Sequence, residues 1–460
     1  MQRDSIDFAN EPVGSLFGKM LFPTLVGMVS IVVLNITDGA FVGHGVGGDG
    51  LAAVNIAAPI YSIMSGLGLM FGAGCSVVAS IHMSRGNQKA ADINITQALI
   101  ACLLVGVLVA ALILCNLEAT CRFFGSNDTL LPLAVSYLKW IALFLPLNIL
   151  SLAGEFVVRL DGSPRYAMFC TLVTALLNIF LDWLLIFPLG CGLEGAAIAT
   201  AVSMSLAGIM LMVYILFFSK TIHLRRLKHT WKSLRLSLRN IGYQMRMGFS
   251  AFLGELAVSC IVVVGNYVFI RYLGEAGVAA YSVACYCLPI GLMLGNAISQ
   301  SSQPIISFAY GVGNRPRLKR ARNVSVMTGL LAGLLGASFL FFGSPFITSV
   351  FLDRAEPGFS LCTYGLPRIA FCFLFLVFNL ALIGYYQSIE RSREAIAFTL
   401  LRGFIFVIPC FILLPKVLDT DGLWLAMPFS EALTMLVMLV YSALRSRVSR
   451  GSEVSGTFNV

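Results

Sequence analysis

Twelve apolar stretches constrain the fold of this chain more than any other feature of its sequence. Each is long enough to supply the ~20 apolar residues that a helix needs to cross a bilayer. They lie near residues 15–43, 51–81, 93–116, 132–158, 166–188, 195–218, 247–271, 278–308, 322–343, 361–386, 395–415 and 422–444. Charged residues make up only 12% of the chain, about half of what a soluble domain carries. The sequence therefore predicts an all-α polytopic membrane protein with twelve transmembrane helices.

The basic residues between these stretches predict the orientation of the chain. If the N-terminus is cytoplasmic, 24 Lys and Arg residues fall on the inner side, six on the outer side, and only Arg402 lies in mid-membrane. Basic loops favour the cytoplasmic side, so we expect a multi-pass protein with both termini inside. This loop charge also accounts for the net charge of +9 without a nucleic-acid partner.

The two halves of the sequence repeat each other. At an offset of 227 residues the first half matches the second at small residues of the first two loops, namely Gly47, Gly50, Ala52, Ala53, Gly86 and Asn87 against Gly274, Gly277, Ala279, Ala280, Gly313 and Asn314. An even number of crossings per repeat means that both repeats point the same way, about an axis along the membrane normal. The sequence thus predicts two six-helix lobes related by pseudo-twofold symmetry, with a cleft between them suited to alternating access.

The repeat sets the expected domain boundaries. The N-lobe takes residues 1–218, a linker takes 219–246, the C-lobe takes 247–444, and a cytoplasmic tail takes 445–460. In the linker, an apolar residue recurs at helical spacing among eight basic ones, at Leu224, Leu227, Trp231, Leu234 and Leu238. This pattern predicts an amphipathic helix over residues 221–240 that lies on the inner membrane surface.

Two carboxylates in the first half are the leading candidates for a binding site. Asp38 and Asp182 both fall in the outer halves of outward-running helices, and Asn178 precedes Asp182 by one turn on the same face. Thr200 lies at a matching depth, and Asn148 in the middle of the fourth stretch is a further candidate member. Hard cations prefer such oxygen-only sets. Two carboxylates in one dry site also resist double ionisation, so one is expected to hold a proton near neutral pH.

The alternative is that these acids are structural, with Asp38 capping a kink at residues 37–39. The repeat argues against this alternative, because the 227-residue offset places Gly265 and Pro409 at the matching positions. A structural need common to both lobes would leave acids in both. We therefore interpret the pair as a specialised H⁺ or Na⁺ site; an Na⁺ ion there is the only metal the sequence predicts.

The remaining intramembrane acids allow several interpretations. Glu431 and Arg402 are expected to form a structural ion pair, since either charge alone in the membrane is costly. Glu155 precedes Arg159 by one helical turn, which predicts a local ion pair at the interface. Glu255 has no obvious basic partner, and we consider both a substrate-cavity or second-ion role and a merely solvated carboxylate.

Several chemistries find no support in the sequence. Residues 14–19 lack the spacing of an ATP-binding P-loop, and the four histidines form no metal-ligand spacing. We therefore expect a chain that is not an enzyme, holds no cofactor and draws on an ion gradient. A membrane-embedded transferase would need clustered His and Asp residues near a membrane face, and only His44 lies near a membrane carboxylate.

Several motifs together resemble those of the multidrug and toxic compound extrusion (MATE) transporters of prokaryotes. They are DGAFVGH at 38–44, GLAA at 50–53, LNIFLD at 177–182, GAAIAT at 195–200, GVAA at 277–280 and GVGN at 311–314. The resemblance implies a monomeric exporter of the bacterial inner membrane that exchanges H⁺ or Na⁺ for small organic, usually cationic, drugs and toxic compounds.

The resemblance also carries roles to matching positions. Asp38, Asn178, Asp182 and Thr200 correspond to the N-lobe cation or proton site of prokaryotic members. Glu255 corresponds to an acid used in another branch, whose companion acid has no match here, because residues 372–387 contain no Asp or Glu. A flippase for lipid-linked saccharides remains an alternative, but it predicts a strongly cationic cleft that a single paired arginine would not supply.

Overall fold

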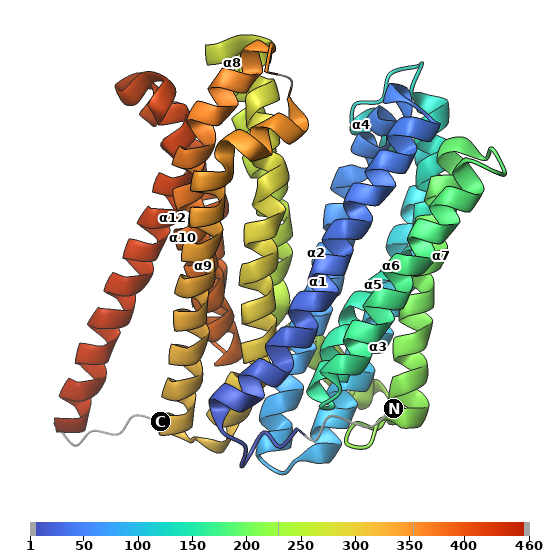
Figure 1. Ribbon diagram of the computed structural model, residues 1–460. Helices are drawn as coiled ribbons and strands as arrows, with labels where there is room; N and C mark the ends of the chain where they lie inside the picture. Colours follow the sequence, from blue (N-terminus) through green and yellow to red (C-terminus); the bar gives the residue numbers. More distant parts are fainter. Residues whose placement is uncertain (1–5, 229, 353, 455–460) are drawn as a thin grey trace. The chain divides into compact units, whose positions relative to one another are not determined.

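The chain folds almost entirely into helices (Figure 1). The computed structural model describes residues 6–228, 230–352 and 354–454, and for 446–454 the backbone alone. The helices of the first half are α1 (Val13–Gly45), α2 (Gly48–Ser84), α3 (Gln88–Cys115), α4 (Leu117–Phe123), α5 (Leu131–Leu160), α6 (Pro164–Ile186) and α7 (Gly192–Val213), which ends in a π-helical turn, η1 (Tyr214–Phe218). Those of the second half are α8 (Trp231–Val312), α9 (Arg315–Phe351), α10 (Pro357–Ser388), α11 (Ser392–Leu400), the π-helical turn η2 (Leu401–Ile405) and α12 (Val407–Val454).

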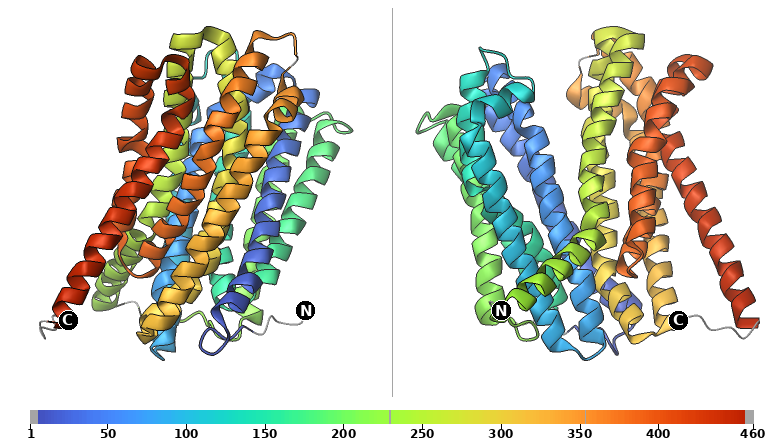
Figure 2. Two further views of the ribbon diagram at one scale, coloured as in Figure 1. Left: turned by 60° about the vertical axis from the view of Figure 1, so that its left-hand side comes forward. Right: turned by 180° about the vertical axis from the view of Figure 1, so that it is seen from behind.

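Ten helical segments of the described chain are long and apolar enough to cross a membrane. Two of them contain two crossings each. The 82 residues of α8 are interrupted by non-helical backbone at Gly274, and this helix reverses its direction near its middle (Figure 2). The other is the segment Ser392–Arg445, formed by α11, η2 and α12, which is interrupted in the same way at Asp419 of α12. These two breaks lie where the sequence predicts loops, so the helices accommodate all twelve predicted crossings.

The repeat extends to the backbone conformation of the loops. Gly47 and Gly274, which match at the 227-residue offset, have φ angles of 91° and 65°. Gly86 and Gly313 match at the same offset and have φ angles of 73° and 76°. Side chains other than that of glycine rarely adopt this left-handed region. The matching glycines therefore adopt the same left-handed turn conformation in both halves.

Packing in the first half centres on α5. This helix packs against α2, α3 and α7, while α6 lies between α1 and α7. Glycines allow close approach at two of these interfaces: a Cβ at Gly72 of α2 would come within 2.7 Å of the Phe156 ring of α5. A Cβ at Gly208 of α7 would come within 2.6 Å of the Leu147 carbonyl oxygen of α5. These small residues hold α2, α5 and α7 together and so position the polar side chains described below.

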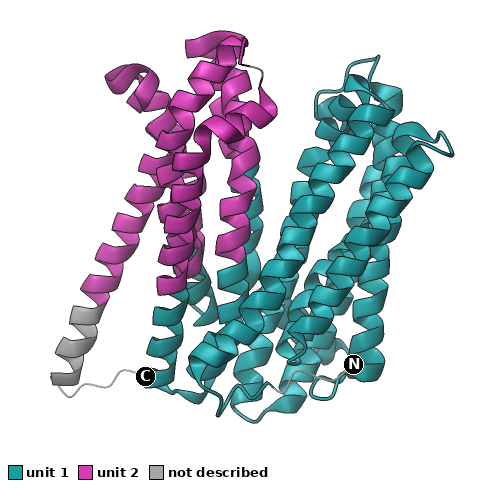
Figure 3. Ribbon diagram, in the orientation of Figure 1, with its two compact units in different colours: residues 1–259, 297–325, 384–395 teal, residues 260–296, 326–383, 396–460 magenta. Residues whose placement is uncertain are grey.

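The described chain divides into two compact units (Figure 3). Unit 1 comprises residues 1–259, 297–325 and 384–395, and unit 2 comprises 260–296, 326–383 and 396–460. The core of unit 2 contains three aromatic rings in contact: Phe269 stacks on Tyr281 at 4.4 Å and meets Trp424 edge-on at 4.8 Å, measured between ring centroids. Unit 1 therefore contains the first half of the sequence together with three segments of the second half, those at residues 247–259, 297–325 and 384–395.

The helix predicted in the linker over residues 221–240 is wrong in its first half. Residues 219–228 are not helical, and the helix expected from residue 221 begins only at Trp231. The reason is that side chains of the first half bind the two backbone groups that would form the first hydrogen bond of this helix: Gln88 donates to the Thr221 carbonyl at 2.5 Å, and the Arg225 N–H donates to the Thr96 hydroxyl at 3.0 Å. Asp161 also accepts from the Thr221 N–H at 3.0 Å and Asp92 from the His223 N–H at 3.2 Å, so the segment is bound along its length. His229 of the predicted helix lies outside the described residues.

Candidate ion-binding site

The site begins with two helices that pack against each other, α1 and α6. Asp38 lies on α1, which runs without interruption to Gly45. The Thr37 hydroxyl donates to the Val33 carbonyl within the same helix at 2.8 Å, so residues 37–39 form an ordinary helical turn and Asp38 caps no kink. Asp182 lies on α6, four residues from its C-terminal end, and is fully buried.

The two carboxyl groups face each other across the α1–α6 interface. They lie within hydrogen-bonding reach of one another. One oxygen of each, Asp38 Oδ1 and Asp182 Oδ1, is buried and has no hydrogen-bond partner among the described residues. Like charges at this separation in a dry site repel strongly. Such an arrangement is favourable when a proton or a small cation lies between the oxygens.

Asn178 and Thr200 join this pair to α7. In the orientation that satisfies both ends of its amide, Asn178 donates to Asp182 Oδ2 at 3.1 Å and accepts from the Thr200 N–H at 3.2 Å. The Thr200 hydroxyl lies 3.3 Å from the same amide. The structure thus brings Asp38, Asp182, Asn178 and Thr200 together, and this set can offer a cation oxygen ligands only.

Two tyrosines beside the carboxylates have no counterpart in the sequence predictions. Tyr61 of α2 and Tyr137 of α5 lie within electrostatic range of Asp38 and Asp182, and the Tyr61 hydroxyl has no hydrogen-bond partner among the described residues. Both hydroxyls are deeply buried; in an apolar helix a tyrosine is an ordinary core residue. Only the packing of α2 against α5 places these two near the acids, so no sequence signal could identify them.

Two further candidates lie apart from this cluster. The Asn148 Oδ1 atom accepts from the Ser205 hydroxyl of α7 at 3.4 Å, and its Nδ2 atom has no partner in the described chain. Glu255 lies on α8, between Phe252, which packs on Gly66, and Ser259, whose hydroxyl is 3.2 Å from that of Ser62. No described basic side chain forms an ion pair with Glu255. The roles predicted for Asn148 and Glu255 stay predictions.

The second half contains a different buried polar group. Arg402 donates to Glu431 Oε1 through Nε at 3.0 Å and through an Nη atom at 2.9 Å. Asn379 of α10 donates to the other carboxylate oxygen at 2.7 Å. Both charged side chains are at most 5% exposed, and Arg402 lies in η2, where the helix locally widens to a π-helical turn. The guanidinium is therefore neutralised in place, and Arg402 does not supply the cationic cleft expected of a saccharide flippase.

Glu155 and Arg159 also form an ion pair, at 2.7 Å, but this pair differs from the exposed one that the sequence predicts. Arg159 is buried and donates to the Gln300 side chain at 2.7 Å, while Glu155 accepts from the Thr171 hydroxyl. The pair is thus part of a network that joins α5, α6 and α8 within unit 1.

Twelve membrane crossings in two related halves, with a buried acid pair in one half, are the architecture of a secondary transporter. The comparisons with known proteins agree. The sequence model of the MatE family matches residues 23–184 and again residues 251–413, once in each half. The chain belongs to the MatE family, the MATE transporters.

Two curated relatives and one solved structure illustrate this membership. The FAD transporter of Shewanella oneidensis is 25% identical over 466 aligned residues, which cover 96% of this chain and 97% of that protein. The multidrug export protein MepA of Staphylococcus saprophyticus is 24% identical, with 94% of each chain covered. The crystal structure of a MATE protein in complex with MaL6 matches the fold with a TM-score of 0.88 at 20% identity, covering 96% of this chain and 98% of that one.

Proposed function

We propose that this chain is an antiporter that exports small organic cations in exchange for H⁺ or Na⁺. The observation that carries the proposal is the contact between Asp38 and Asp182, each of which keeps one buried oxygen without a partner among the described residues. A structural acid in a membrane is expected to pair with a base, as Glu431 does with Arg402. The acid pair instead has the composition of a site that binds a proton or a cation.

The proposed coupling follows from the positions of the two acids. A proton or Na⁺ bound between them cancels the repulsion across the α1–α6 interface and allows the two helices to pack closely. Release of the ion restores the repulsion and favours a different position of α1. Pro23 within α1 removes one backbone hydrogen bond and is a point where such a bend would form. The resulting change in the cavity would release the substrate outward.

We further propose that the protein acts as a monomer in the cytoplasmic membrane, with both termini inside. The predicted excess of basic residues on the inner side supports this orientation.

A second substrate class is an anionic flavin nucleotide. The similarity to a protein named FAD transporter favours it. Against it stands Arg402, the basic residue deepest in the predicted membrane region, which is buried and already bound to Glu431. Organic cations therefore remain the first candidate.

Efflux from proteoliposomes tests the proposal. The purified chain is reconstituted with a fluorescent cationic dye or with FAD, and a pH gradient and a sodium gradient are imposed separately. We expect dye efflux under one gradient, and its loss in both Asp38→Asn and Asp182→Asn. Asp49→Asn is the matched control, because Asp49 is an exposed acid in the first turn of α2. Full ion-driven efflux in both Asn variants would contradict the coupling role, and efflux of FAD alone would replace the substrate class.

A further inference from the structure

The first turns of α8 expose four apolar side chains, of which Leu236, at 47% exposed, lies apart from the other three. Trp231 is 81% exposed, Leu238 is 62% exposed and Leu234 is 49% exposed. At 3.6 residues per turn these three fall within an arc of about 60° on one side of the helix. Nothing among the described residues covers this arc.

Basic side chains occupy the neighbouring arc of the same turns. Arg235, Arg239 and Lys232 follow the apolar arc within about the next 100° of rotation. All three are exposed, and none forms a salt bridge with a described residue. The sequence contains no Asp or Glu from residue 195 to residue 254. The surface therefore presents an apolar strip beside a strip of uncompensated positive charge.

The third side of the helix is fixed against α3 by polar contacts. Gln97 of α3 donates to the Ser237 hydroxyl at 2.8 Å and accepts from the Asn240 amide at 3.3 Å. One turn further along, Gln244 donates to the Asn94 side chain at 2.9 Å. These contacts set the rotation of the helix, so Trp231, Leu234 and Leu238 cannot turn inward.

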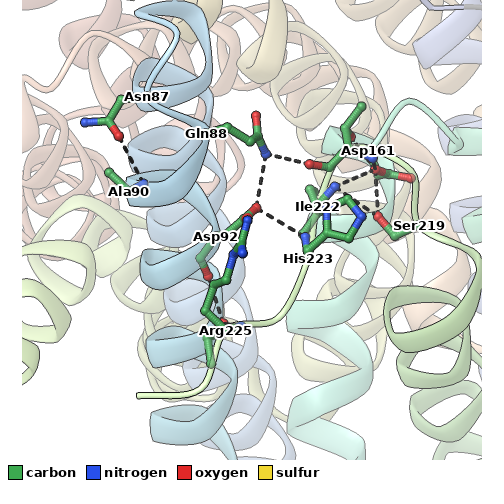
Figure 4. Close-up of polar contacts among 11 residues, drawn as sticks. Asn87, Gln88, Ala90, Asp92, Asp161, Ser219, Ile222, His223 and Arg225 are labelled. Carbon is green, nitrogen blue, oxygen red and sulfur yellow. Dashed lines mark hydrogen bonds and ion pairs between the residues drawn. The ribbon is translucent and has the colours of Figure 1, made fainter. Parts of the chain in front are cut away.

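The segment before the helix is anchored as firmly. Figure 4 shows the carboxylates of Asp161 and Asp92 turned toward residues 219–225. Asp161 accepts from the Ser219 hydroxyl at 2.8 Å and from the Ile222 N–H at 3.2 Å, and Asp92 accepts from the Arg225 guanidinium at 3.0 Å. The chain thus enters the helix from a fixed point at the ends of α3 and α5.

We propose that the surface formed by Trp231, Lys232, Leu234, Arg235, Leu238 and Arg239 is a docking site for anionic phospholipids of the adjacent membrane leaflet. The apolar strip suits the acyl boundary and the basic strip suits phosphate groups at the same depth. Each basic residue close to an anionic bilayer favours binding about five-fold. A lipid surface is the occupant because α8 runs on from these turns, without a break before Gly274, into the membrane crossing predicted at residues 247–271.

Quenching by brominated lipids tests the assignment on the full-length protein in bilayers. Brominated phosphatidylglycerol and brominated phosphatidylcholine are compared at equal mole fraction, and the contribution of Trp231 is taken as the difference between the wild type and Trp231→Phe. We expect the anionic lipid to quench Trp231 about two-fold more strongly than the zwitterionic one, with the preference falling as salt rises. A second arm removes the charges, in the triple variant Lys232→Gln/Arg235→Gln/Arg239→Gln, for which the two lipids should quench equally.

The matched control removes three exposed basic residues elsewhere in unit 1, as Lys319→Gln/Arg320→Gln/Arg393→Gln. It should keep the preference of the wild type. Equal quenching by both lipids in the wild type would overturn the proposal, as would quenching by aqueous acrylamide but by neither lipid. The salt series needs only the wild type and Trp231→Phe, so it tests the proposal even if the triple variant fails to fold.

Discussion

The two halves of the chain bury acids in opposite ways. In the first half Asp182 meets a second acid, Asp38, and an oxygen of each has no partner among the described residues. In the second half Glu431 meets Arg402, and both carboxylate oxygens accept hydrogen bonds. The halves repeat each other in sequence and in the φ angles of matching loop glycines. The two halves therefore share their loop glycines but differ in their buried polar groups. Residues that match between the halves maintain the common fold, and residues found in one half only have a role specific to that half.

The largest difference between the two halves should appear when Asp182 and Glu431 are each neutralised. Asp182→Asn removes one of two repelling charges, so we expect ion-driven efflux to fall at least about ten-fold while the thermal unfolding temperature holds or rises. Glu431→Gln leaves the Arg402 guanidinium buried without a counter-charge and should lower that temperature markedly. Efflux assays and unfolding scans in one detergent compare the two variants. Equal loss of stability in both would remove the distinction between the sites.

The Arg402–Glu431 pair allows a sharper test. Removing one partner of a buried pair costs about 3–5 kcal/mol, because the other charge is left uncompensated. We expect Arg402→Met to lose stability on this scale and the double variant Arg402→Met/Glu431→Gln to recover more than half of it. Denaturant unfolding of the single and double variants measures the coupling. Additive losses would show that the two side chains do not act as a pair.

The tyrosines beside the acid pair should have a smaller effect. Tyr61→Phe deletes a buried hydroxyl close to Asp38 and Asp182 and retains the ring. The Tyr61 hydroxyl has no partner among the described residues, so it is free to donate to the acid pair during ion binding. Such a hydrogen bond contributes about 0.5–1.5 kcal/mol, so its loss should weaken the apparent affinity for the driving ion about two- to ten-fold. Tyr281→Phe is a matched control, because it removes a buried hydroxyl from the aromatic core of unit 2. If Tyr281→Phe changed ion dependence as much as Tyr61→Phe, proximity to the acids would not be the cause.

The smallest effect on stability is expected at an ion pair on the surface. The Lys19 ammonium of α1 lies 2.5 Å from Glu11, which precedes that helix, and its hydrogen bond holds the pKa of the Glu11 carboxyl below its usual value. The stabilisation is therefore present above the unfolded pKa of Glu11 and is lost as pH falls through the lowered folded pKa. Lys19→Gln should remove this acid-side dependence, with a loss of at most about 1 kcal/mol near neutral pH. Unfolding of both proteins between about pH 3 and 7 checks it.

Much of the fold could be predicted because membrane crossing imposes a length and a composition on each helix. The twelve stretches and the repeat follow from that constraint, and so does the depth shared by Asp38, Asp182 and Thr200. The extended part of the linker could not be predicted, because its spacing of leucines fits a helix. The carboxylates that bind this extended segment, Asp92 and Asp161, are distant from it in sequence and resemble ordinary loop acids.

The same limit explains the tyrosines near the acid pair. Tyr61 and Tyr137 lie 76 positions apart in the sequence, and each fits its own helix as a core residue. Periodicity along one helix carries no information about which neighbour it will face. The sequence could therefore identify the two acids, whose cost in lipid is high, and then Asn178 and Thr200 by their spacing and depth relative to those acids. It could not identify the tyrosines, whose cost in lipid is low.

The anchoring of residues 219–225 bears on how the two halves are held together. Asp92 and Asp161 fasten the end of the first half to its own helices, and Gln97 fastens the start of α8 to the same place. The peptide bonds between Lys228 and Trp231 consequently join two points that are already docked. We expect a chain cut between these residues to keep its first fragment bound to the start of α8, so that the two fragments purify together.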